Sequence, residues 1–348
     1  MQNQKLGFEE SLGREVVNSG RCIGCATCVV VCPFNCLEYQ KEQPELVKAC
    51  EKCGICPKVC PRYDWSQSSV EEFVFGKKRD AKEDYGIYRR TIVAQATDKK
   101  ILQRCQDGGV VTSLLIHALQ NDLIEGAAIS GLSTDEPLHP MPIMATIPEE
   151  VLKHAGTRYA YSPNILALQE GVRQKKKSLA FVGTPCQIHA IRKIQMFPLK
   201  KYSNPLQFTI GLMCTESFTY DGLFEQHLQK NMEIPLKNVV KMNIKGKIQV
   251  YLKSGKVESI PLSEAKQYAR ASCHLCGDFS AELADISAGG LGLSGWTFVI
   301  LRTRRGEEIF DDASKAGVLQ VRSAEEEPFA QSLLVKLSKR KRRNAQEK

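Results

Sequence analysis

Long apolar runs are missing from this 348-residue chain. No stretch approaches the roughly 20 apolar residues of a membrane-spanning helix. The first residues, MQNQKLGFEESLGREV, also lack the apolar core of a secretory signal. We therefore expect a soluble, cytoplasmic chain. With 43% hydrophobic residues, it is long enough for a small module and a larger domain that has its own core.

A motif for nucleic-acid binding is also absent, although the formal net charge is +9. Much of the positive charge falls in residues 336–343, and no aromatic residue interleaves with it. We therefore exclude RNA and DNA as partners. Residues 326–348 are expected to form a basic C-terminal helix or tail, either solvated or docked on an acidic protein partner or an anionic membrane surface.

Cysteine, by contrast, is abundant, and eight of the fourteen cysteines form two strings near the start of the chain. Each string has the spacing C-x2-C-x2-C-x3-C-P, in which the fourth cysteine of a bacterial-type ferredoxin binds the other cluster. Zinc usually takes separated cysteine pairs instead, and disulfides are favoured still less. We predict a two-cluster ferredoxin-like domain over residues 1–70, which carries electrons one at a time. One 4Fe-4S cluster is assigned to Cys22, Cys25, Cys28 and Cys60, and the other to Cys32, Cys50, Cys53 and Cys56.

Beyond residue 90, short β-branched runs alternate with amphipathic stretches, which predicts an α/β (α+β) domain over residues 71–325. Residues 66–69 are interpreted as the linker that precedes it. The pattern predicts strands over 91–94, 126–129, 178–182, 208–212 and 297–301, helices over 109–119, 187–194 and from Pro328, and a hairpin over 247–252 and 256–260.

Four further cysteines form a second group of candidate ligands. Cys186 and Cys214 each follow a predicted strand, and Cys273 and Cys276 form a C-x2-C pair. Because strand ends converge on one edge of an α/β sheet, the four thiols can meet there and bind a third 4Fe-4S cluster. Zinc, or two unrelated buried thiols beside a redox pair, fits the spacing equally well.

The remaining cysteines, Cys36 and Cys105, have no partner in sequence. Cys36 is interpreted as a small buried filler beside a cluster, and Cys105 as a free surface or core thiol.

Glycine pairs mark candidate ligand-binding turns. Gly108 and Gly109 precede a predicted helix, where backbone can approach a flavin pyrophosphate and unpaired N–H groups can bind it. A Gly-Gly pair alone is more often just a tight turn, and so are residues 156–159 and 289–290. We expect any flavin here to bind outside a Rossmann fingerprint.

Seven motifs of the larger domain can be compared with known families: residues 106–112, 156–159, 183–187, 214–217, 273–278, 284–287 and 295–296. Taken in order, they resemble the family of coenzyme F420-reducing hydrogenase beta subunits. The resemblance covers about residues 75–320. With the ferredoxin module added, the arrangement is most similar to the F subunit of archaeal membrane-bound reduced-F420 dehydrogenases, the electron-input arm of a complex-I-like enzyme.

This resemblance implies an iron–sulfur flavoprotein that oxidises reduced coenzyme F420 by hydride transfer to FAD. Single electrons would then pass through three 4Fe-4S clusters to partner subunits or ferredoxin, with peripheral association at the cytoplasmic face of the membrane through those partners. A soluble F420–ferredoxin oxidoreductase, a hydrogenase beta subunit and a non-catalytic iron–sulfur relay are the alternatives. The third cluster is implied on Cys186, Cys214, Cys273 and Cys276, and FAD contacts on Gly108, Gly109, Thr112, Thr157, Tyr159, Gly183 and Thr184.

Three lysines and two histidines complete the set of candidates. Lys175, Lys176 and Lys177 would suit the anionic tail of F420, or form a solvated turn. His189 and His274 are candidate proton or hydrogen-bond groups, although packing is the more common role for such residues.

Overall fold

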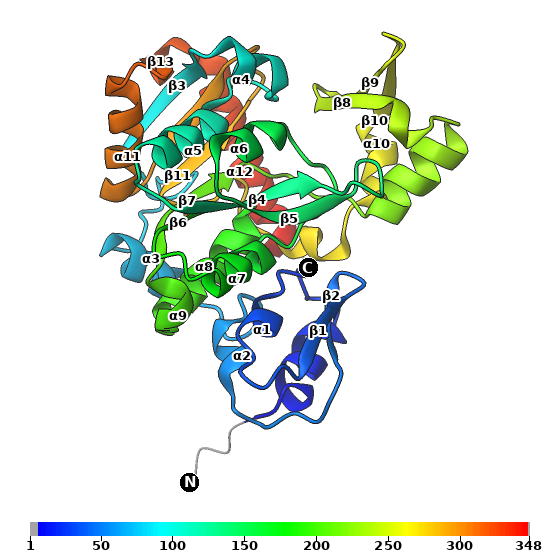
Figure 1. Ribbon diagram of the computed structural model, residues 1–348, viewed down its shortest axis with the longest axis vertical. Helices are drawn as coiled ribbons and strands as arrows, with labels where there is room; N and C mark the ends of the chain where they lie inside the picture. Colours follow the sequence, from blue (N-terminus) through cyan, green and yellow to red (C-terminus); the bar gives the residue numbers. More distant parts are fainter. Residues whose placement is uncertain (1–5, 347–348) are drawn as a thin grey trace.

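The computed structural model describes residues 6–346. Figure 1 shows a small N-terminal module below a larger domain, from which a three-stranded lobe extends to one side. The module is held by one antiparallel hairpin and short helices. Its elements are a helical segment Glu9–Val17, α1 Thr27–Val30, β1 Leu37–Gln40, β2 Gln43–Leu46 and α2 Ile55–Val59.

The larger domain is built on an eight-stranded sheet of order β13-β3-β12-β11-β7-β6-β4-β5. Its centre, β4, β6, β7 and β11, is parallel, so the carboxyl ends of these four strands meet at one edge. The strands are β3 Arg90–Ala96, β4 Gly126–Leu132, β5 Pro140–Ala145, β6 Leu179–Gly183, β7 Leu206–Leu212, β11 Ile286–Gly289, β12 Thr297–Leu301 and β13 Leu319–Ser323.

Helices cover both faces of this sheet, because side chains along a buried strand alternate between the two faces. In β6, Ala180 packs with Leu114 of α5 in one core, whereas Phe181 packs with Ile188 of α8 in another. Helices α5 Val110–Gln120, α6 Pro148–Lys153 and α11 Arg304–Lys315 belong to the first face, and α7 Ile165–Arg173, α8 Pro185–Met196 and α9 Lys200–Ser203 to the second.

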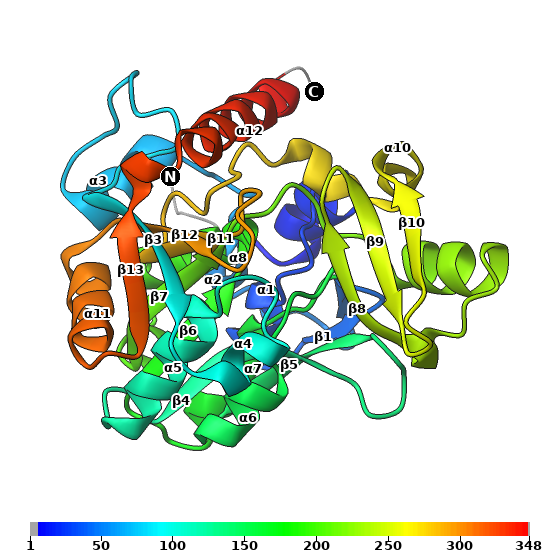
Figure 2. The same cartoon turned by 90° about the horizontal axis from the view of Figure 1, so that it is seen from above.

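The lobe has its own apolar core, which includes Phe218, Leu228 and Ile248. Its sheet has the order β10-β9-β8 and packs beside a long helical segment (Figure 2). The lobe contains the helical segment Tyr220–Asn231, β8 Val239–Ile244, β9 Lys247–Leu252, β10 Val257–Pro261 and α10 Leu262–Ala265. Other short elements of the chain are helix α4 Lys99–Arg104 and the 3-10 turns Leu236–Asn238, Lys266–Tyr268, Ala271–Leu275 and Ala324–Glu326.

The predicted strands, the hairpin and the terminal helix are all present, but two boundaries differ. The predicted linker 66–69 opens helix α3, Gln67–Phe75, because the Ser66 side chain accepts a hydrogen bond from the Ser69 amide at 3.3 Å and caps that helix. The predicted domain boundary at residue 70 therefore falls inside a helix. Helix α12, Pro328–Gln346, packs its Leu334 into the larger domain and is not a detached tail.

The module docks on the larger domain through side chains that bind backbone carbonyls across the junction. The Tyr202 hydroxyl donates to the Val30 carbonyl at 2.7 Å, and Arg62 Nη1 donates to the Leu275 carbonyl at 3.0 Å. A buried carbonyl that loses such a partner raises the free energy of the folded state, so these bonds fix the docking geometry.

Within residues 6–346, none of the helices combines the length and apolar character of a membrane span.

Arg302 joins the sheet to two neighbouring loops. Its side chain is 1% exposed, and Nη1 donates to the carbonyls of Ile87 at 2.9 Å and Tyr85 at 3.0 Å. Nε donates to Ser287 Oγ at 2.7 Å, and Nη2 donates to the Ser280 carbonyl at 3.1 Å. One buried guanidinium therefore satisfies acceptors on three segments that are far apart in the sequence.

We expect Arg302→Met to lower the free energy of unfolding by about 3 kcal/mol or more, because each orphaned buried acceptor costs roughly 1–3 kcal/mol. Anaerobic urea unfolding followed by circular dichroism measures the change. The control is Arg304→Met, whose side chain is 86% exposed and which should cost less than about 0.5 kcal/mol. Equal effects of the two changes would contradict this assignment.

Candidate functional site

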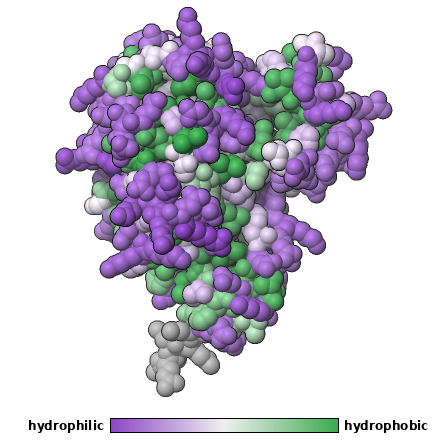
Figure 3. All heavy atoms as spheres, in the orientation of Figure 1, coloured by the Kyte–Doolittle hydropathy of each residue, from purple (hydrophilic) through white to green (hydrophobic). Residues whose placement is uncertain are grey.

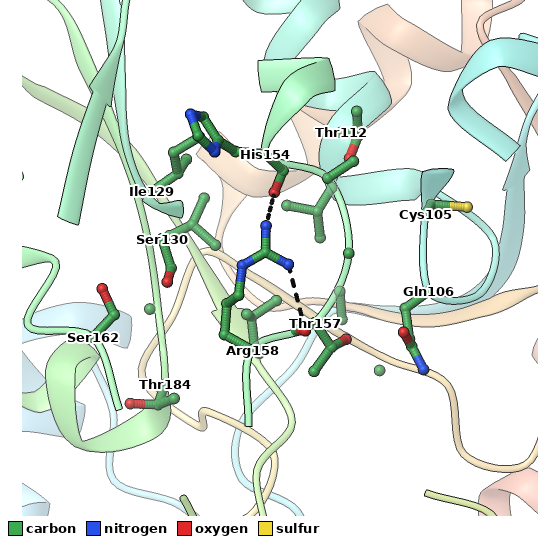
Figure 4. Close-up of a pocket in the computed structure, with 18 of the residues that line it drawn as sticks. Cys105, Gln106, Thr112, Ile129, Ser130, His154, Thr157, Arg158, Ser162 and Thr184 are labelled. Atoms are coloured by element: carbon green, nitrogen blue, oxygen red, sulfur yellow. Dashed lines mark hydrogen bonds between the residues drawn. The ribbon is translucent and has the colours of Figure 1, made fainter. Parts of the chain in front are cut away.

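A cavity of about 270 Å³ lies at the sheet edge where the parallel strands end. The start of α5, the ends of β4 and β6 and the loop around residues 154–164 form its walls (Figure 4). Five of the predicted flavin contacts line it: Gly109, Thr112, Thr157, Gly183 and Thr184.

The other two predicted contacts, Gly108 and Tyr159, are not among the residues that line this cavity. A Cβ atom on Gly108 would lie 2.6 Å from the Ala94 carbonyl oxygen, so glycine is needed there for close packing against β3. The Tyr159 side chain packs against the core of the lobe. The seven predicted flavin contacts thus include residues that pack within the fold as well as residues that line the cavity.

Gly109 shapes the helix start that faces the cavity. It caps α5 with φ at +72°, and a Cβ atom there would lie 2.7 Å from Ile101 Cγ2. Other residues rarely adopt this backbone conformation. Val110 and Val111, in the first turn of α5, line the cavity, so the unpaired N–H groups of the helix start lie beside it.

Arg158 is a cavity residue that the sequence reasoning missed. Its Nη2 donates to the His154 carbonyl at 2.9 Å and its Nη1 to the Thr157 carbonyl at 3.4 Å (Figure 4). Burial lowers the pKa of the Arg158 guanidinium to about 10, so the group still carries its charge at neutral pH. A fixed cation in this wall suits an anionic ligand group.

Three buried polar atoms in the cavity wall have no hydrogen-bond partner. They are Ser130 Oγ, the Tyr161 hydroxyl and Gln187 Oε1. Orphaned buried polar atoms are uncommon, because each loses its bonds to water without compensation. A flavin ring carries both carbonyl and N–H groups along one edge, so these donors and acceptors fit such a ligand.

The four thiols of the second cysteine group converge on a second, smaller cavity. Cys186 lies in the first turn of α8, Cys214 follows β7, and Cys273 and Cys276 lie in and just after the turn Ala271–Leu275. All four line this cavity. In residues 6–346 no three histidine, cysteine or carboxylate side chains are grouped as ligands of a single metal ion. The thiols surround a space, as the ligands of a four-iron cube do.

The surroundings of these thiols disfavour bare thiolates. Burial, and then the neighbouring Cys276 thiol, raises the pKa of Cys186 to about 11. Burial likewise raises the pKa of Cys214 to about 12. The groups would therefore stay protonated at neutral pH without a metal, whereas iron binds the thiolate form and supplies the missing charge.

In the module, thiols from the two cysteine strings lie close to one another. Cys32, from the first string, lines one cavity with Cys50, Cys53 and Cys56 of the second. Burial, and next the nearby Cys60 thiol, raises the pKa of Cys25 to about 12, so these two cysteines lie close together. Backbone amides also approach the sulfurs: Phe8 N lies 3.4 Å from Cys50 Sγ, and Arg62 N lies 3.4 Å from Cys60 Sγ.

The two extra cysteines are buried. Cys36 lines the Cys32 cavity and donates to the Ala49 carbonyl at 3.3 Å, as expected of a filler beside a cluster. Cys105 lines the larger cavity and donates to the Asp107 carbonyl at 2.9 Å.

The module contributes to the wall of the thiol cavity in the larger domain. Ile23, next to Cys22, and Arg62, two residues after Cys60, both line it. Arg270 holds this junction, because its Nη1 donates to the Ile23 carbonyl at 2.9 Å and its Nε pairs with Glu42 at 2.7 Å. The Arg270 guanidinium also lies 4.0 Å above the Tyr161 ring.

Several other candidates lie away from the cavity. Residues 175–177 precede β6, at the opposite end of that strand from Gly183, so they do not form a basic cleft at the cavity. His189 Nε2 lies 3.0 Å from Asp278 Oδ2, and its ring stacks on Trp65 of the module at 4.6 Å. His189 therefore makes both a hydrogen bond and a packing contact, and it lines neither the large cavity nor the thiol cavity. His274 is exposed beside the thiol ligands.

One glycine run has the spacing of the dinucleotide fingerprint. Gly290, Gly292 and Gly295 match G-x-G-x-x-G, but β12 follows at Thr297 where the fingerprint requires a helix. The run therefore lacks the helix start that binds a pyrophosphate in Rossmann domains.

The fold and the thiol sets define an iron–sulfur oxidoreductase with a ferredoxin motif. Residues 91–169 and 176–327 match the models for the N-terminal and C-terminal parts of the coenzyme F420 hydrogenase/dehydrogenase beta subunit, and residues 15–38 match a 4Fe-4S binding domain. The chain belongs to the family of coenzyme F420 hydrogenase/dehydrogenase beta subunits.

Relatives and a solved structure agree with this family. The coenzyme F420 hydrogenase subunit beta of Methanococcus voltae is 38% identical over 261 residues, 74% of this chain and 92% of that protein. The F subunit of the F420H2 dehydrogenase of Methanosarcina mazei is 31% identical over 312 residues, 85% of this chain and 83% of that protein. A chain of the F420-reducing NiFe hydrogenase complex from Methanosarcina barkeri is 36% identical, with a TM-score of 0.73 over 77% of this chain and 94% of that one.

We expect Cys273→Ser to remove roughly four iron atoms from the anaerobically purified protein, because one cube would be lost. Cys105→Ser is the control: its thiol is buried but lies outside the three sets, so the iron content of this variant should stay unchanged. Iron and acid-labile sulfide are measured on both variants. If Cys273→Ser kept the full iron content, the third set would not be a cluster site.

Proposed function

We propose that this chain oxidises reduced coenzyme F420 with a bound FAD and passes the electrons one at a time through three 4Fe-4S clusters to a partner protein. FAD is assigned to the cavity at the carboxyl edge of the sheet. The clusters are assigned to the Cys186 set (with Cys214, Cys273 and Cys276), the Cys22 set (with Cys25, Cys28 and Cys60) and the Cys32 set (with Cys50, Cys53 and Cys56).

The observation that carries this proposal is a shared wall. Tyr161, Thr184 and Ser217 line both the large cavity and the cavity of the Cys186 set. Ile23 and Arg62, which are neighbours of Cys22 and Cys60 in the sequence, line that thiol cavity. This arrangement supports the order of large cavity, Cys186 set and Cys22 set, which electron transfer from a flavin to a ferredoxin module requires.

The chemistry of a flavin and of iron–sulfur clusters explains why a flavin site and cysteine sets would occur in one chain. A bound flavin would exchange a hydride with the deazaflavin and release electrons singly, the form in which an iron–sulfur cube carries them. The chain supplies orientation and charge. Gly109 and the start of α5 would face the pyrophosphate, and Ser130 and Gln187 would bind the polar edge of the ring. Arg158 would hold an anionic group of either ligand.

The surface of the module supports electron exit from the Cys32 set. Leu6 and Phe34 line the cavity of this set, and each is 44% exposed. In Figure 3, apolar residues cover a larger share of the module than of the larger domain. An exposed apolar patch over a cluster suits a docked electron acceptor.

Relatives suggest the kind of acceptor. They are named as subunits of hydrogenase and dehydrogenase complexes, and one is the F subunit of an F420H2 dehydrogenase, which matches 85% of this chain. We propose the same arrangement here: an electron-input subunit of a complex-I-like dehydrogenase, cytoplasmic and held at the membrane by its partners. A soluble ferredoxin is the alternative acceptor.

Purified anaerobically, the chain should contain about three 4Fe-4S clusters and one flavin, and should oxidise reduced F420 with an artificial one-electron acceptor. NADH and NADPH, tested in the same assay, should be inactive. A preparation with all its iron but no flavin would contradict the catalytic function and leave an iron–sulfur relay.

We expect Gly109→Ala to weaken flavin binding about tenfold, because a Cβ atom at this left-handed position costs roughly 1–2 kcal/mol or shifts the helix start. Gly255→Ala is the matched control. Gly255 also has a positive φ, of +84°, but it lies in the β9–β10 turn, where a Cβ atom meets nothing within 4 Å. Flavin affinity is measured by fluorescence titration, and iron content should be equal in both variants. Equal flavin affinity of the two variants would contradict a flavin site at the start of α5.

A further inference from the structure

Helix α12 reaches the Cys186 set from outside the matched family domain. The family models end at residue 327, and α12 begins at Pro328. Figure 2 shows α12 running past one face of the sheet, and its far end contacts the turn Ala271–Leu275 that carries Cys273. The helix therefore adds side chains to the thiol cavity that the shared domain does not supply.

The position of α12 is fixed along its length. Ala330 and Leu334 are buried in a core that also contains Phe279 and Phe298. Nearer its end, Arg342 pairs with the buried carboxylate of Glu282.

A second ion pair holds the same end of the helix. Lys339 Nζ lies 2.9 Å from Asp84 Oδ2. Lys339 and Arg342 thus anchor the helix turn that contains Lys341.

The side chain of Lys341 brings a positive charge to the cavity of the thiol set. Its Nζ donates to the Cys214 carbonyl at 2.6 Å, and its side chain lines the cavity of Cys186, Cys214, Cys273 and Cys276. Among residues 6–346, no carboxylate lies within ion-pair distance, 4.0 Å, of this ammonium group. Two other cations line this cavity: Arg270 is paired with Glu42, and Arg62 donates to the Leu275 carbonyl at 3.0 Å. Among the described residues, Lys341 is therefore a positive charge held at the thiol cavity without a carboxylate in ion-pair contact, and the Asp278 carboxylate acts on it from a longer distance.

We propose that Lys341 is a positioning residue for electron transfer that raises the reduction potential of the cluster held by the Cys186 set. The inference rests on the proposed function, because it requires a cluster on these four thiols. A cube that accepts one electron becomes one unit more negative, and a nearby fixed cation stabilises that reduced form. When the electron leaves for the Cys22 set, the cube returns to its oxidised charge.

The arrangement favours the first one-electron step. A raised potential makes the Cys186 set a better acceptor for an electron from the flavin, which would lie across the wall of Tyr161, Thr184 and Ser217. The basic end of the chain then has an internal role at the third cluster.

The test is an anaerobic redox titration followed by electron paramagnetic resonance, with the third cluster identified as the signal lost in Cys273→Ser. In Lys341→Gln we expect the one-electron reduction equilibrium of that cluster to fall about tenfold, which for one electron is a shift of about 59 mV to lower potential. The potentials of the two module clusters should stay unchanged. Lys341→Arg keeps the charge and should retain the wild-type potential.

Lys336→Gln is the matched charge control, because Lys336 is an exposed lysine of the same helix and does not line the thiol cavity. It should leave all three potentials unchanged. An unchanged third potential in Lys341→Gln with full iron content would overturn the inference.

Two further outcomes separate this inference from the proposed function. If Lys341→Gln and the near-isosteric Lys341→Met both lost four iron atoms, Lys341 would serve cluster assembly, and the effect on potential would be rejected. If the wild-type protein held only the two module clusters, the proposed function would be contradicted, and Lys341 would have no third cluster on which to act.

Discussion

The arrangement of the sites depends on the parallel centre of the sheet. Because β4, β6, β7 and β11 run in one direction, their carboxyl ends meet, and the residues that follow them form two adjoining cavities. Thr184, directly after β6, lies in the wall of both. Cys186 follows two residues later in the first turn of α8. A single strand-to-helix turn therefore separates the candidate flavin site from the first candidate cluster and also supplies a ligand to that cluster.

The ferredoxin module continues this series because it is docked in one orientation. Arg270 binds the Ile23 carbonyl beside Cys22, and Arg62, two residues after Cys60, binds the Leu275 carbonyl beside Cys276. These bonds run in opposite directions across the junction, so the module can neither rotate nor withdraw without losing buried partners. The ligand strings of the module and the Cys273 turn of the larger domain are thus held together as one unit.

Much of this could be predicted from the sequence, because the relevant signals are local. Cysteine spacing suggested two interlocked ligand sets in the module, which remain a prediction, and strand patterns indicated that Cys186 and Cys214 follow neighbouring strands. The residues that join the parts could not be predicted. Arg270 and Lys341 act through contacts with residues distant in sequence, and a lone arginine or lysine in a basic chain carries no spacing signal. The charged run at the end of the chain suggested a solvated or docking tail, whereas Lys341 and Arg342 are held against the larger domain.

The central claim is that one chain contains a flavin and three clusters arranged in series. An anaerobic crystal structure of the protein with its cofactors, with anomalous data collected at the iron edge, tests this claim most directly. Our account predicts three iron sites, one within each set of four cysteines, and flavin density in the cavity between the start of α5 and Thr184. Iron confined to the module, or a flavin bound away from the wall of Tyr161, Thr184 and Ser217, would contradict it.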